Sequence, residues 1–487
     1  MPNIDTVDVN TPSDEYNSML LDWHLPMTLM GGQRAMREAG TIYLPKEPAE
    51  SQALYENRLN RSILFNVYSH TVKALTGRVF SRPISLSDDT NKKIVQYNDN
   101  IDLLGSDINT FWRNVFEDAM IKGLSYVLVD YPNTGSNNSL YDDIQQNIRP
   151  YCIHIKAEQV IRAVPKYVAG RVELGRVHIR EIVEVPSGLW GTVKITQVRV
   201  LYPGYWEVYR LGDKDKWGLY DSGETSLSYI PLAVYYSNRT GFHTGISPLM
   251  DLANLNLGHW QSESDQRNIL HVARVPILFG TGLDPEEIGD LEIGANRLII
   301  GQDGSTLDFV EHTGQAIGSG DTDLKNIEQR MAVAAMEPSL STGSATGDAL
   351  DTNKANSALQ DMALRLQDTI DIVNQMMADW AGLGENAGGT ATVSRDFGLM
   401  KRDGSESGIL LKARQNKSIS IETFLKEIKK RGLLSDDFDM EAELLRLEEE
   451  KMDNMPTTIS GYQDENGKQV VGTKNENNLD FGLQRIE

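Results

Sequence analysis

The sequence predicts an α+β protein, in which helices and strands occupy separate stretches of a chain of 487 residues. Residues 151–236 contain runs such as RVHIREIVEV and GTVKITQVRVLY, with Gly, Pro and Asp between them. This pattern predicts an antiparallel meander with one buried face. Helix signals at 247–275 and 321–336 flank a Gly-rich stretch. The length allows about two to four domains and several cores.

The first 150 residues predict helices that lead into a buried strand. Apolar residues at helical spacing or helix-end signals predict four helices, at about 13–23, 33–39, 50–79 and 107–122. Gly123 follows the last of them, and SYVLVD at 125–130 then predicts the strand. The polar stretch 131–147 predicts a loop.

Two long helices with a small lobe between them are predicted in the middle of the chain. The first begins at Ser247-Pro248, because the serine hydroxyl can cap an orphan N–H and proline has none to satisfy, and it ends before Pro276. The second runs from about 321 to 336 and is halted by Pro338. Short strands are predicted in the lobe at 277–279, 297–300 and 306–311. Two rods joined by a lobe suit a protein that spans something rather than one that holds a pocket.

The C-terminal third predicts more helices, joined by polar segments. Residues 337–353 (EPSLSTGSATGDALDTN) are too polar and Gly-rich to be packed, and a helix with one apolar stripe follows at about 354–383. Ser420 can cap a helix over 421–431, and an acidic amphipathic helix follows at 438–452. The last segment, about 35 residues long, is low in large apolar residues and is expected to be mobile.

The composition is that of a folded soluble protein, with 40% hydrophobic and 24% charged residues. The apolar runs are too short to cross a bilayer, and the acidic N-terminus does not resemble a signal peptide. One cysteine, Cys152, excludes an intrachain disulfide and a cysteine-based metal cluster, which fits a reducing cytoplasm. The formal net charge of −22 can be explained by good solvation of the surface alone, without any functional role. It argues against a protein that grips nucleic acid, but not against one past which DNA slides.

Catalytic signatures are absent from the sequence. The segment after Gly467-Lys468 lacks the Ser or Thr of a phosphate-binding loop, and the Gly280–Gly282 stretch lacks the third glycine of a dinucleotide fingerprint. GSATG at 343–347 has alanine where a nucleophile elbow has serine. We therefore expect no enzyme activity and no cofactor.

A metal site is not expected either. His259 and His271 are too far apart on one helix to share a metal, and are interpreted as core or interface residues. Asp321, Asp323 and Glu328 do not match a calcium loop, and are interpreted as first-turn acids favoured by the helix dipole.

Two arginines and an apolar cluster have competing interpretations. Arg267 and Arg274 align along the first long helix and could touch a phosphate backbone, but pairing with Glu263 or with a neighbouring subunit is favoured. The apolar cluster predicts packing rather than a cofactor site, and consists of Met362, Met376, Met377 and Trp380.

From GISPL at 245–249 and DLANLN at 251–256, the chain resembles portal proteins of tailed bacteriophages, and especially a poorly characterised phage family grouped with them. The resemblance extends to YENRL at 55–59, LTGRVF at 75–80, 123–132, VEHTG at 310–314, 419–425 and Arg431-Gly432. The order and spacing of these segments carry it, over about residues 15–455.

This resemblance implies a portal architecture with wing, helical stem, small β-containing clip, channel loop and helical crown. The implied parts are the wing (1–244), stem helix 1 (245–275), clip (276–320), stem helix 2 (321–337), channel (tunnel) loop (338–353), wing return helix and linker (354–407), crown (408–455) and a mobile tail (456–487).

The resemblance also implies site residues in three of these parts. The DNA-facing residues of the channel loop would be Ser339, Ser341, Thr342, Ser344, Thr346, Asp348, Asp351 and Lys354. The site residues of the stem would be Ser247, Pro248, Arg267, Arg274 and Arg330. The docking residues of the clip, where terminase and then an adaptor bind, would be Asp284, Glu286, Glu287, Asp290 and Glu292.

A portal implies a homo-oligomeric ring, usually of twelve subunits, at one capsid vertex. It is assembled in the bacterial cytoplasm and ends up in the virion. The implied partners are the large terminase subunit, head-completion, adaptor or tail proteins, the major capsid or scaffolding protein, and double-stranded DNA that passes through non-specifically; no membrane is implied. Two alternatives stay open: another ring-forming head-neck adaptor, and a hydrolase with dispersed acidic residues.

Overall fold

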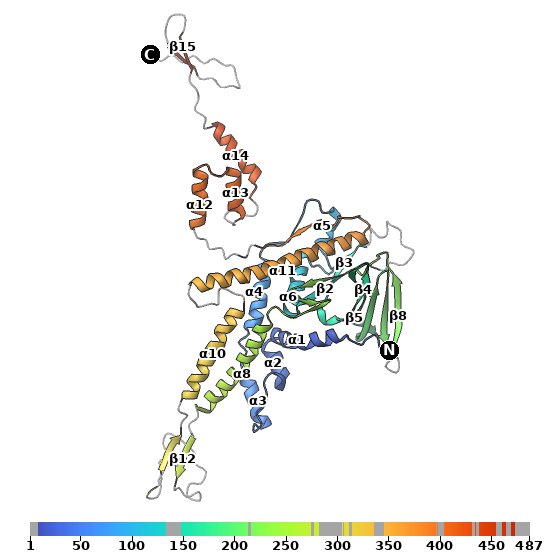
Figure 1. Ribbon diagram of the computed structural model, residues 1–487, viewed down its shortest axis with the longest axis vertical. Helices are drawn as coiled ribbons and strands as arrows, with labels where there is room; N and C mark the ends of the chain where they lie inside the picture. The colour runs from blue at the N-terminus through green and yellow to red at the C-terminus, as the bar shows by residue number, and fades with distance from the viewer. Residues whose placement is uncertain are drawn as a thin grey trace. The chain divides into compact units, whose positions relative to one another are not determined.

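The computed structural model describes residues 8–132, 148–212, 216–273, 277–281, 304, 306–310, 314–335, 345–395, 397, 404–430, 434, 438–453, 460–463 and 469–472. They belong to two compact units, Met1–Phe397 and Gly398–Glu487. In the first unit (Figure 1), most strands lie within residues 124–245, between two helical regions, and the strand pairs among the described residues are antiparallel. This arrangement agrees with the predicted α+β class.

The helices of the N-terminal region are α1 (Asp14–Met30), α2 (Gly32–Ala39), η2 (Gly40–Ile42), α3 (Gln52–Arg61), α4 (Val67–Val79), α5 (Lys92–Asn98) and α6 (Ile108–Lys122). The side chain of Ser13 caps α1, and that of Asp107 caps α6. Helix α1 continues through Pro26, well beyond the predicted end at residue 23. The prediction of α6 is confirmed, and Gly123 ends this helix with a φ of 89°.

The single helix predicted over 50–79 is wrong, because the chain forms α3 and α4 with a break between them. At the break, the backbone of Ser62 is extended and its hydroxyl bonds to that of Ser264 at 2.8 Å. The side chain of Asn66 accepts a hydrogen bond from Ser69 N and donates one to Leu29 O. Hydrogen bonds to distant parts of the chain thus replace a turn of helix that local spacing favoured.

Two antiparallel sheets fill residues 124–236. The order β3–β2–β9 makes a three-stranded sheet from β2 (Leu124–Asp130), β3 (Tyr151–Ile155) and β9 (Leu232–Tyr236). After η3 (Ala157–Gln159), a five-stranded meander contains β4 (Val160–Val168), β5 (Arg171–Ser187), β6 (Gly191–Tyr202), β7 (Tyr205–Leu211) and β8 (Trp217–Glu224). Short pairs join β1 (Ser85–Leu86) to β14 (Ala391–Thr392), and β10 (Arg239–Gly241) to β11 (Thr244–Gly245).

The meander predicted over 151–236 is confirmed for β4 to β8 and corrected at its two ends, where β3 and β9 join β2 in the other sheet. Its buried face covers only part of its length. Val177 and Ile179 on β5, and Val198 and Val200 on β6, are buried against the rest of the unit. Beyond them, residues 183–195 of the same two strands have no buried position. The outer half of the β5–β6 hairpin therefore stands free of the core.

The long helix α11 (Ala345–Trp380) packs its predicted apolar stripe into the main core. Leu366, Ile370 and Val373 are fully buried there. The helix begins nine residues before the predicted residue 354, so 345–353 are helical and not loop. Extending an anchored helix adds one hydrogen bond per residue without a new nucleation cost, and this outweighs the polar composition.

Helix α8 (Met250–Ala273), strands β12 (Ile277–Thr281) and β13 (Thr306–Val310), and helix α10 (Gln315–Ala334) follow one another along the chain. In Figure 1, α8 (green) and α10 (yellow) lie side by side and lead to the β12–β13 pair. Two of the predicted lobe strands are confirmed, and the third (297–300) lies outside the described residues. Helix α10 begins six residues before the predicted start at 321.

The second unit contains α12 (Gly404–Gln415), α13 (Ile421–Lys430), α14 (Met440–Asp453), β15 (Ser460–Gln463) and β16 (Gln469–Gly472). Ser420 caps α13 through Thr423 N, as predicted, and Asp439 caps α14. Within the last segment, which was expected to be mobile, β15 and β16 form an antiparallel pair. Within the described part of the chain, none of the helices has the length and apolar character to span a membrane.

Candidate functional site: a paired-helix arm and an aromatic groove

We define the arm as α8, β12, β13 and α10. Its helices are antiparallel, because contacts that advance along α8 recede along α10. Contacts that show this are His259 Nε2 to Glu328 Oε1 (3.3 Å), Ser262 Oγ to Asp323 Oδ2 (3.1 Å) and Gln266 Nε2 to the carbonyl of Ile317 (2.9 Å). Polar contacts therefore fix the register of the two helices.

The two helices of the arm come unusually close at Gly320. A Cβ added there would lie 2.1 Å from Oε1 of Gln266, so any larger residue would displace the Gln266 side chain. Gly314 adopts a φ of 78°, which lets the chain turn from β13 into α10. Glycine at 320 therefore leaves room for the Gln266 side chain between the helices, and Gly314 is the N-cap of α10.

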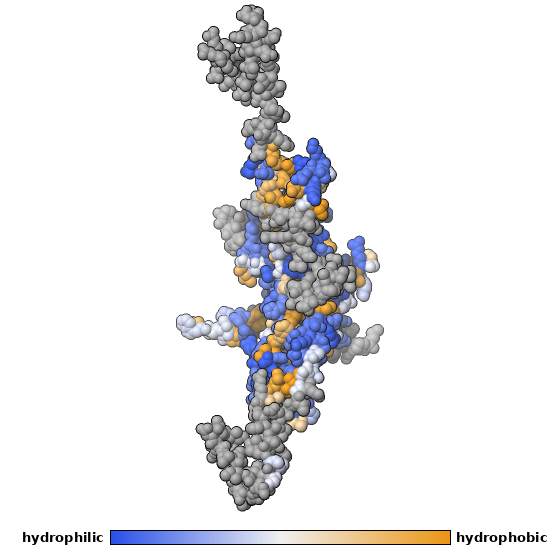
Figure 2. Space-filling view, turned by 90° about the vertical axis from the view of Figure 1, so that its left-hand side faces the viewer, coloured by the Kyte–Doolittle hydropathy of each residue, from blue (hydrophilic) through white to orange (hydrophobic). Residues whose placement is uncertain are grey.

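The base of the arm is apolar, and the rest of α10 is mostly polar on its outside. Met331, Ala335 and Trp260 are fully buried. Farther out, Asp321 pairs with Lys325 on the exposed side of α10 at 2.6 Å. On the face shown in Figure 2, hydrophilic residues dominate and hydrophobic ones gather in separate patches.

Helix α3 braces the arm through a buried arginine. Arg58 makes two hydrogen bonds to Glu50, at 2.9 and 2.8 Å, and lies 3.6 Å from Asp265 on α8. The hydrogen bonds that Arg58 donates to Glu50 raise the pKa of Arg58 in spite of its burial. Together with the Ser62–Ser264 hydrogen bond, this network fixes the side of α8 that does not face α10.

The structure places most of the predicted stem residues. Buried Ser247 accepts a hydrogen bond from Leu249 N and donates one to Met120 O, as a helix-start residue should, although regular α8 begins only at Met250. Pro248 is half-buried beside it. Arg267 pairs with Glu263 at 2.5 Å, which confirms pairing within the chain. Arg330 is exposed on α10, and Arg274 lies outside the described residues.

The acidic residues of α10 are not first-turn acids, which corrects their interpretation. Because α10 starts at Gln315, Asp321, Asp323 and Glu328 lie farther along the helix, where each contacts a neighbouring side chain. His259 is buried and also packs against Phe65, as a core histidine.

The other predicted site residues are only partly placed. Four channel-loop positions lie on α11, without described side chains: Thr346, Asp348, Asp351 and Lys354. The other four, Ser339, Ser341, Thr342 and Ser344, and all five clip residues, Asp284, Glu286, Glu287, Asp290 and Glu292, lie outside the described residues.

A cluster of titratable residues lies in the core, where the sequence analysis did not find it. Lys122 pairs with Asp118 at 2.6 Å and with Glu158, and Ser125 Oγ donates to Asp118 at 2.9 Å. Burial alone would raise the pKa of Asp118, but His154, with Nε2 3.7 Å from the carboxylate, and the charge of Lys122 outweigh it and lower this pKa to about 2. The one sequence signal was a Lys four residues after an Asp on an apolar helix.

This cluster lacks the geometry of a Ser–His–Asp triad. Ser125 gives its only proton to Asp118, so Nε2 of His154, 2.8 Å from the hydroxyl, must donate to it and cannot act as its base. Ser125 is also fully buried. The cluster is a structural network. In the described part of the chain, no group of His, Cys, Asp or Glu side chains is placed to hold a metal.

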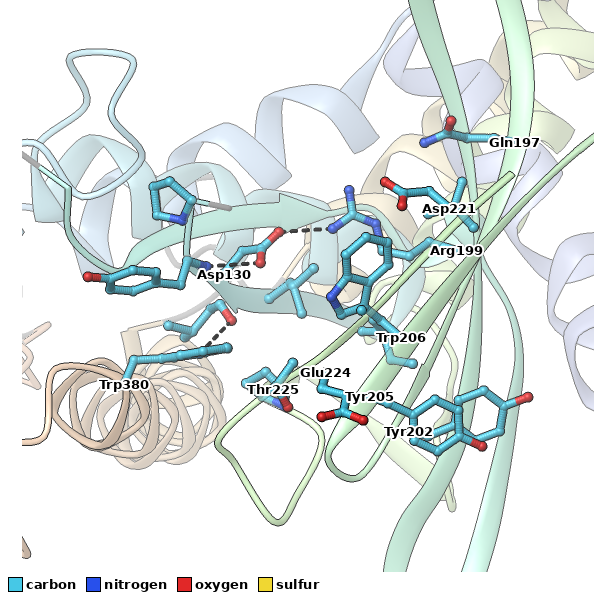
Figure 3. A pocket seen from close by; sticks show the side chains of 18 of the residues that line it. Asp130, Gln197, Arg199, Tyr202, Tyr205, Trp206, Asp221, Glu224, Thr225 and Trp380 are labelled. Atoms are coloured by element: carbon cyan, nitrogen blue, oxygen red, sulfur yellow. Dashed lines mark hydrogen bonds and ion pairs between the residues drawn. The ribbon is translucent and has the colours of Figure 1, made fainter. Parts of the chain in front are cut away.

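A groove of about 600 Å³ opens between the two sheets and α11 (Figure 3). We call it the aromatic groove, because seven aromatic residues line it: Tyr131, Tyr151, Tyr202, Tyr205, Trp206, Tyr220 and Trp380. Tyr202 stacks on Tyr205 with ring centroids 4.2 Å apart, and the indole of Trp380 donates to Val129 O. These contacts hold the rings in place, and the sequence offered no signal that would bring them together.

Charged groups in the groove are mostly paired with one another. Arg199 contacts Asp130 at 2.9 Å and Glu181 at 3.0 Å. Burial would lower the pKa of Arg199, but these two carboxylates raise it. The guanidinium of Arg210 lies 3.5 Å from the ring centroid of Tyr220. The groove is therefore suited to bind an apolar or aromatic group.

Comparisons with known proteins add a family and a group of structures. Residues 248–381 match a family described as "Domain of unknown function (DUF4055)", which covers less than half of the chain. No curated protein matches the sequence.

Similar solved chains come from particles of a gene transfer agent (GTA). A chain in the neck of an empty GTA particle, computed with C6 symmetry, has a TM-score of 0.42 and 13% identity, over 75% of this chain and 89% of that one. A chain in the neck of a native GTA particle, computed with C12 symmetry, has the same score and identity, over 74% and 88%.

Proposed function

We propose that this chain is the subunit of a bacteriophage portal: a ring at one capsid vertex through which the genome is packaged and ejected. The observation that carries the proposal is the arm, in which two antiparallel helices lead away from a mixed core and are joined at their far end by a β pair. Two of the segments on which the resemblance to portal proteins rests adjoin the arm: GISPL directly precedes α8, and VEHTG links the end of β13 to the start of α10.

The contacts within the arm support a role as a channel wall. Its helices are held in register by polar pairs, and α3 braces only one side of α8. The exposed side of α10 carries few large apolar groups, so it can face water or a neighbouring subunit. A net charge of −22 per chain would repel DNA phosphates and reduce sticking during passage.

In this proposal the protein contributes no chemistry. The ring, of about twelve subunits, is assembled in the bacterial cytoplasm and resides in the virion, where the capsid or scaffolding protein surrounds it. The large terminase subunit docks on the clip (276–320) and supplies the packaging energy. Head-completion, adaptor or tail proteins replace it later. Double-stranded DNA passes residues 338–344, which precede α11, without sequence-specific contacts.

Electron micrographs and the mass of the purified protein test this proposal. Twelve chains of 54.3 kDa predict rings of roughly 650 kDa with a central channel. Isolated particles should carry one ring at a single vertex. A monomer of 54.3 kDa at high concentration, without rings in particles, would refute the proposal.

A second experiment addresses the clip. Asp284, Glu286 and Glu287 changed together to lysine should leave rings intact and reduce terminase binding. As a matched control, three lysines replacing Asp14, Glu15 and Asp22, which are exposed on α1, should leave binding unchanged. Equal loss of binding in both variants would point to net charge instead of clip docking.

A further inference from the structure

The free end of the β5–β6 hairpin carries an exposed apolar pair. The ladder ends at Ser187 opposite Gly191, and in the turn between them Leu189 is 91% exposed and Trp190 is 98% exposed. The other six tryptophans of the chain are all buried or partly buried. We call residues 187–191 (SGLWG) the hairpin tip. Exposing a tryptophan so fully on a rigid hairpin is costly unless another molecule covers it.

The aromatic groove has the features that such a tip requires. Its volume of about 600 Å³ and its aromatic faces suit an indole ring and a leucine. The carboxylates of Asp221 and Glu224 line the groove, and an indole N–H, which only donates, needs an acceptor of this kind. The tip carries no charge that would be buried.

The tip cannot enter the groove of its own chain. Arg199 lines the groove and Gly191 is the last residue of the tip, and both lie on strand β6. Eight residues of strand, at about 3.3 Å each, keep them about 26 Å apart. The strand is paired on β5 along this length, so it cannot fold back.

We propose that the Leu189–Trp190 tip of one copy of this chain inserts into the aromatic groove of the next copy. Tip and groove are different surfaces, so the contact is head-to-tail, the kind that closes a ring by rotation. This inference deepens the proposed function and rests on it in one respect, because it names a contact between neighbouring subunits of the ring.

Engineered disulfides test the contact directly. Trp190→Cys and Thr225→Cys place one thiol on the tip and one in the groove, while the native Cys152 is buried. A one-to-one mixture of the two single variants should give a disulfide-linked dimer on a non-reducing gel, and the doubly substituted chain should give a ladder of multimers. Each single variant alone should give neither. As a control for location, Leu104→Cys places a thiol at another highly exposed position, outside the tip. It should not cross-link to Thr225→Cys.

Assembly provides the second measurement. The double variant Leu189→Ser with Trp190→Ser should raise the concentration needed for ring formation by at least about tenfold, because an interface tryptophan commonly dominates binding. Leu104→Ser, at a position 88% exposed, should assemble as the wild type does. Circular dichroism of both variants shows whether they fold.

The outcomes separate this inference from the proposed function. If rings form but the mixed thiols do not cross-link, or the tip variant assembles normally, the tip contact is wrong and the portal proposal stands. That result is also expected if the tip binds the capsid protein or another segment of the chain. If the wild type forms no rings, the portal proposal fails, while a cross-linked dimer would still support the tip contact.

Discussion

Nε2 of His259 on α8 lies 3.3 Å from Oε1 of Glu328 on α10, and it is one of the contacts that set the register of the arm. His259 is buried, whereas the side chain of Glu328 is half-exposed. The pair therefore lies at the edge of the helix interface, where water partly screens the attraction between the two groups.

A double-mutant cycle on this pair tests the register of the arm. His259→Ala, Glu328→Ala and the double variant should show a coupling of about 0.5–1 kcal/mol in urea denaturation, because the pair is only partly shielded. The same cycle with His259 and Asp321, which pairs with Lys325 instead, should show no coupling. Equal coupling in the two cycles would contradict the antiparallel register described here.

Asp118→Asn should lower the free energy of unfolding at pH 7 by about 3 kcal/mol, because it removes a carboxylate that compensates buried Lys122. Asp22→Asn, on the exposed surface of α1, should change it by less than about 0.5 kcal/mol. Chemical denaturation measures both. Similar losses in the two variants would mean that the buried network does not contribute specifically.

The same aspartate predicts part of the acid sensitivity of the protein. Its pKa falls from 3.8 to about 2 on folding, so its stabilisation is complete above pH 3.8 and disappears as the pH falls through about 2. Asp118→Asn should therefore flatten the pH dependence of stability in this window. An unchanged acid profile would show that other groups cause the loss.

Protonation of His243 should cause a second loss of stability on acidification, in a higher pH window than that of Asp118. Burial first, and then the charge of Arg239, lower its pKa from 6.5 to about 4, while its ring stacks on Tyr126 at an angle of 11°. The neutral form is favoured, so stability is complete above pH 6.5 and falls by about 3 kcal/mol down to pH 4. His243→Phe, which keeps a ring beside Tyr126, should remove most of this slope, and His178, whose pKa is also lowered by burial, accounts for the rest. His70→Phe, at an exposed position, should retain it.

Deleting residues 339–344 tests the proposed channel loop without removing any of α11. Rings should still form, because the deletion removes none of the described helices or strands, while packaging or retention of DNA in particles should fall at least about tenfold. The DNA content of purified particles measures this. Deleting 134–139 (TGSNNS), six polar or small residues, should leave it unchanged. Loss of ring formation on deleting 339–344 would show that this segment is structural.

Much of the fold could be predicted from the sequence, because local signals determine where many of its helices and strands begin and end. The caps at Ser13, Asp107 and Ser420, the glycine after α6 and the alternation in the meander each act within a few residues. Predictions failed where distant contacts decided. Ser62 leaves the helix to bond to Ser264, and the first turn of α10 contacts α8 through the hydrogen bond from Gln266 to Ile317 O.

For the candidate sites, the sequence identified the two helices of the arm and the pairing of Arg267 with Glu263. It did not indicate the aromatic groove, whose residues come from several strands and from α11. Nor did it indicate that Trp190 is exposed, since the other tryptophans of the chain are at least partly buried.

The sequence by itself determined the α+β class, the order of most elements and the strongly acidic charge, because hydrophobic period, capping residues and composition act locally or additively. Only the tertiary structure decided the register of α8 on α10, the buried Asp118–Lys122 network and the separation of the hairpin tip from the groove. Each of these three features depends on contacts between segments that are far apart in the chain. Burial and hydrogen bonding between such segments exist only once the whole unit has packed.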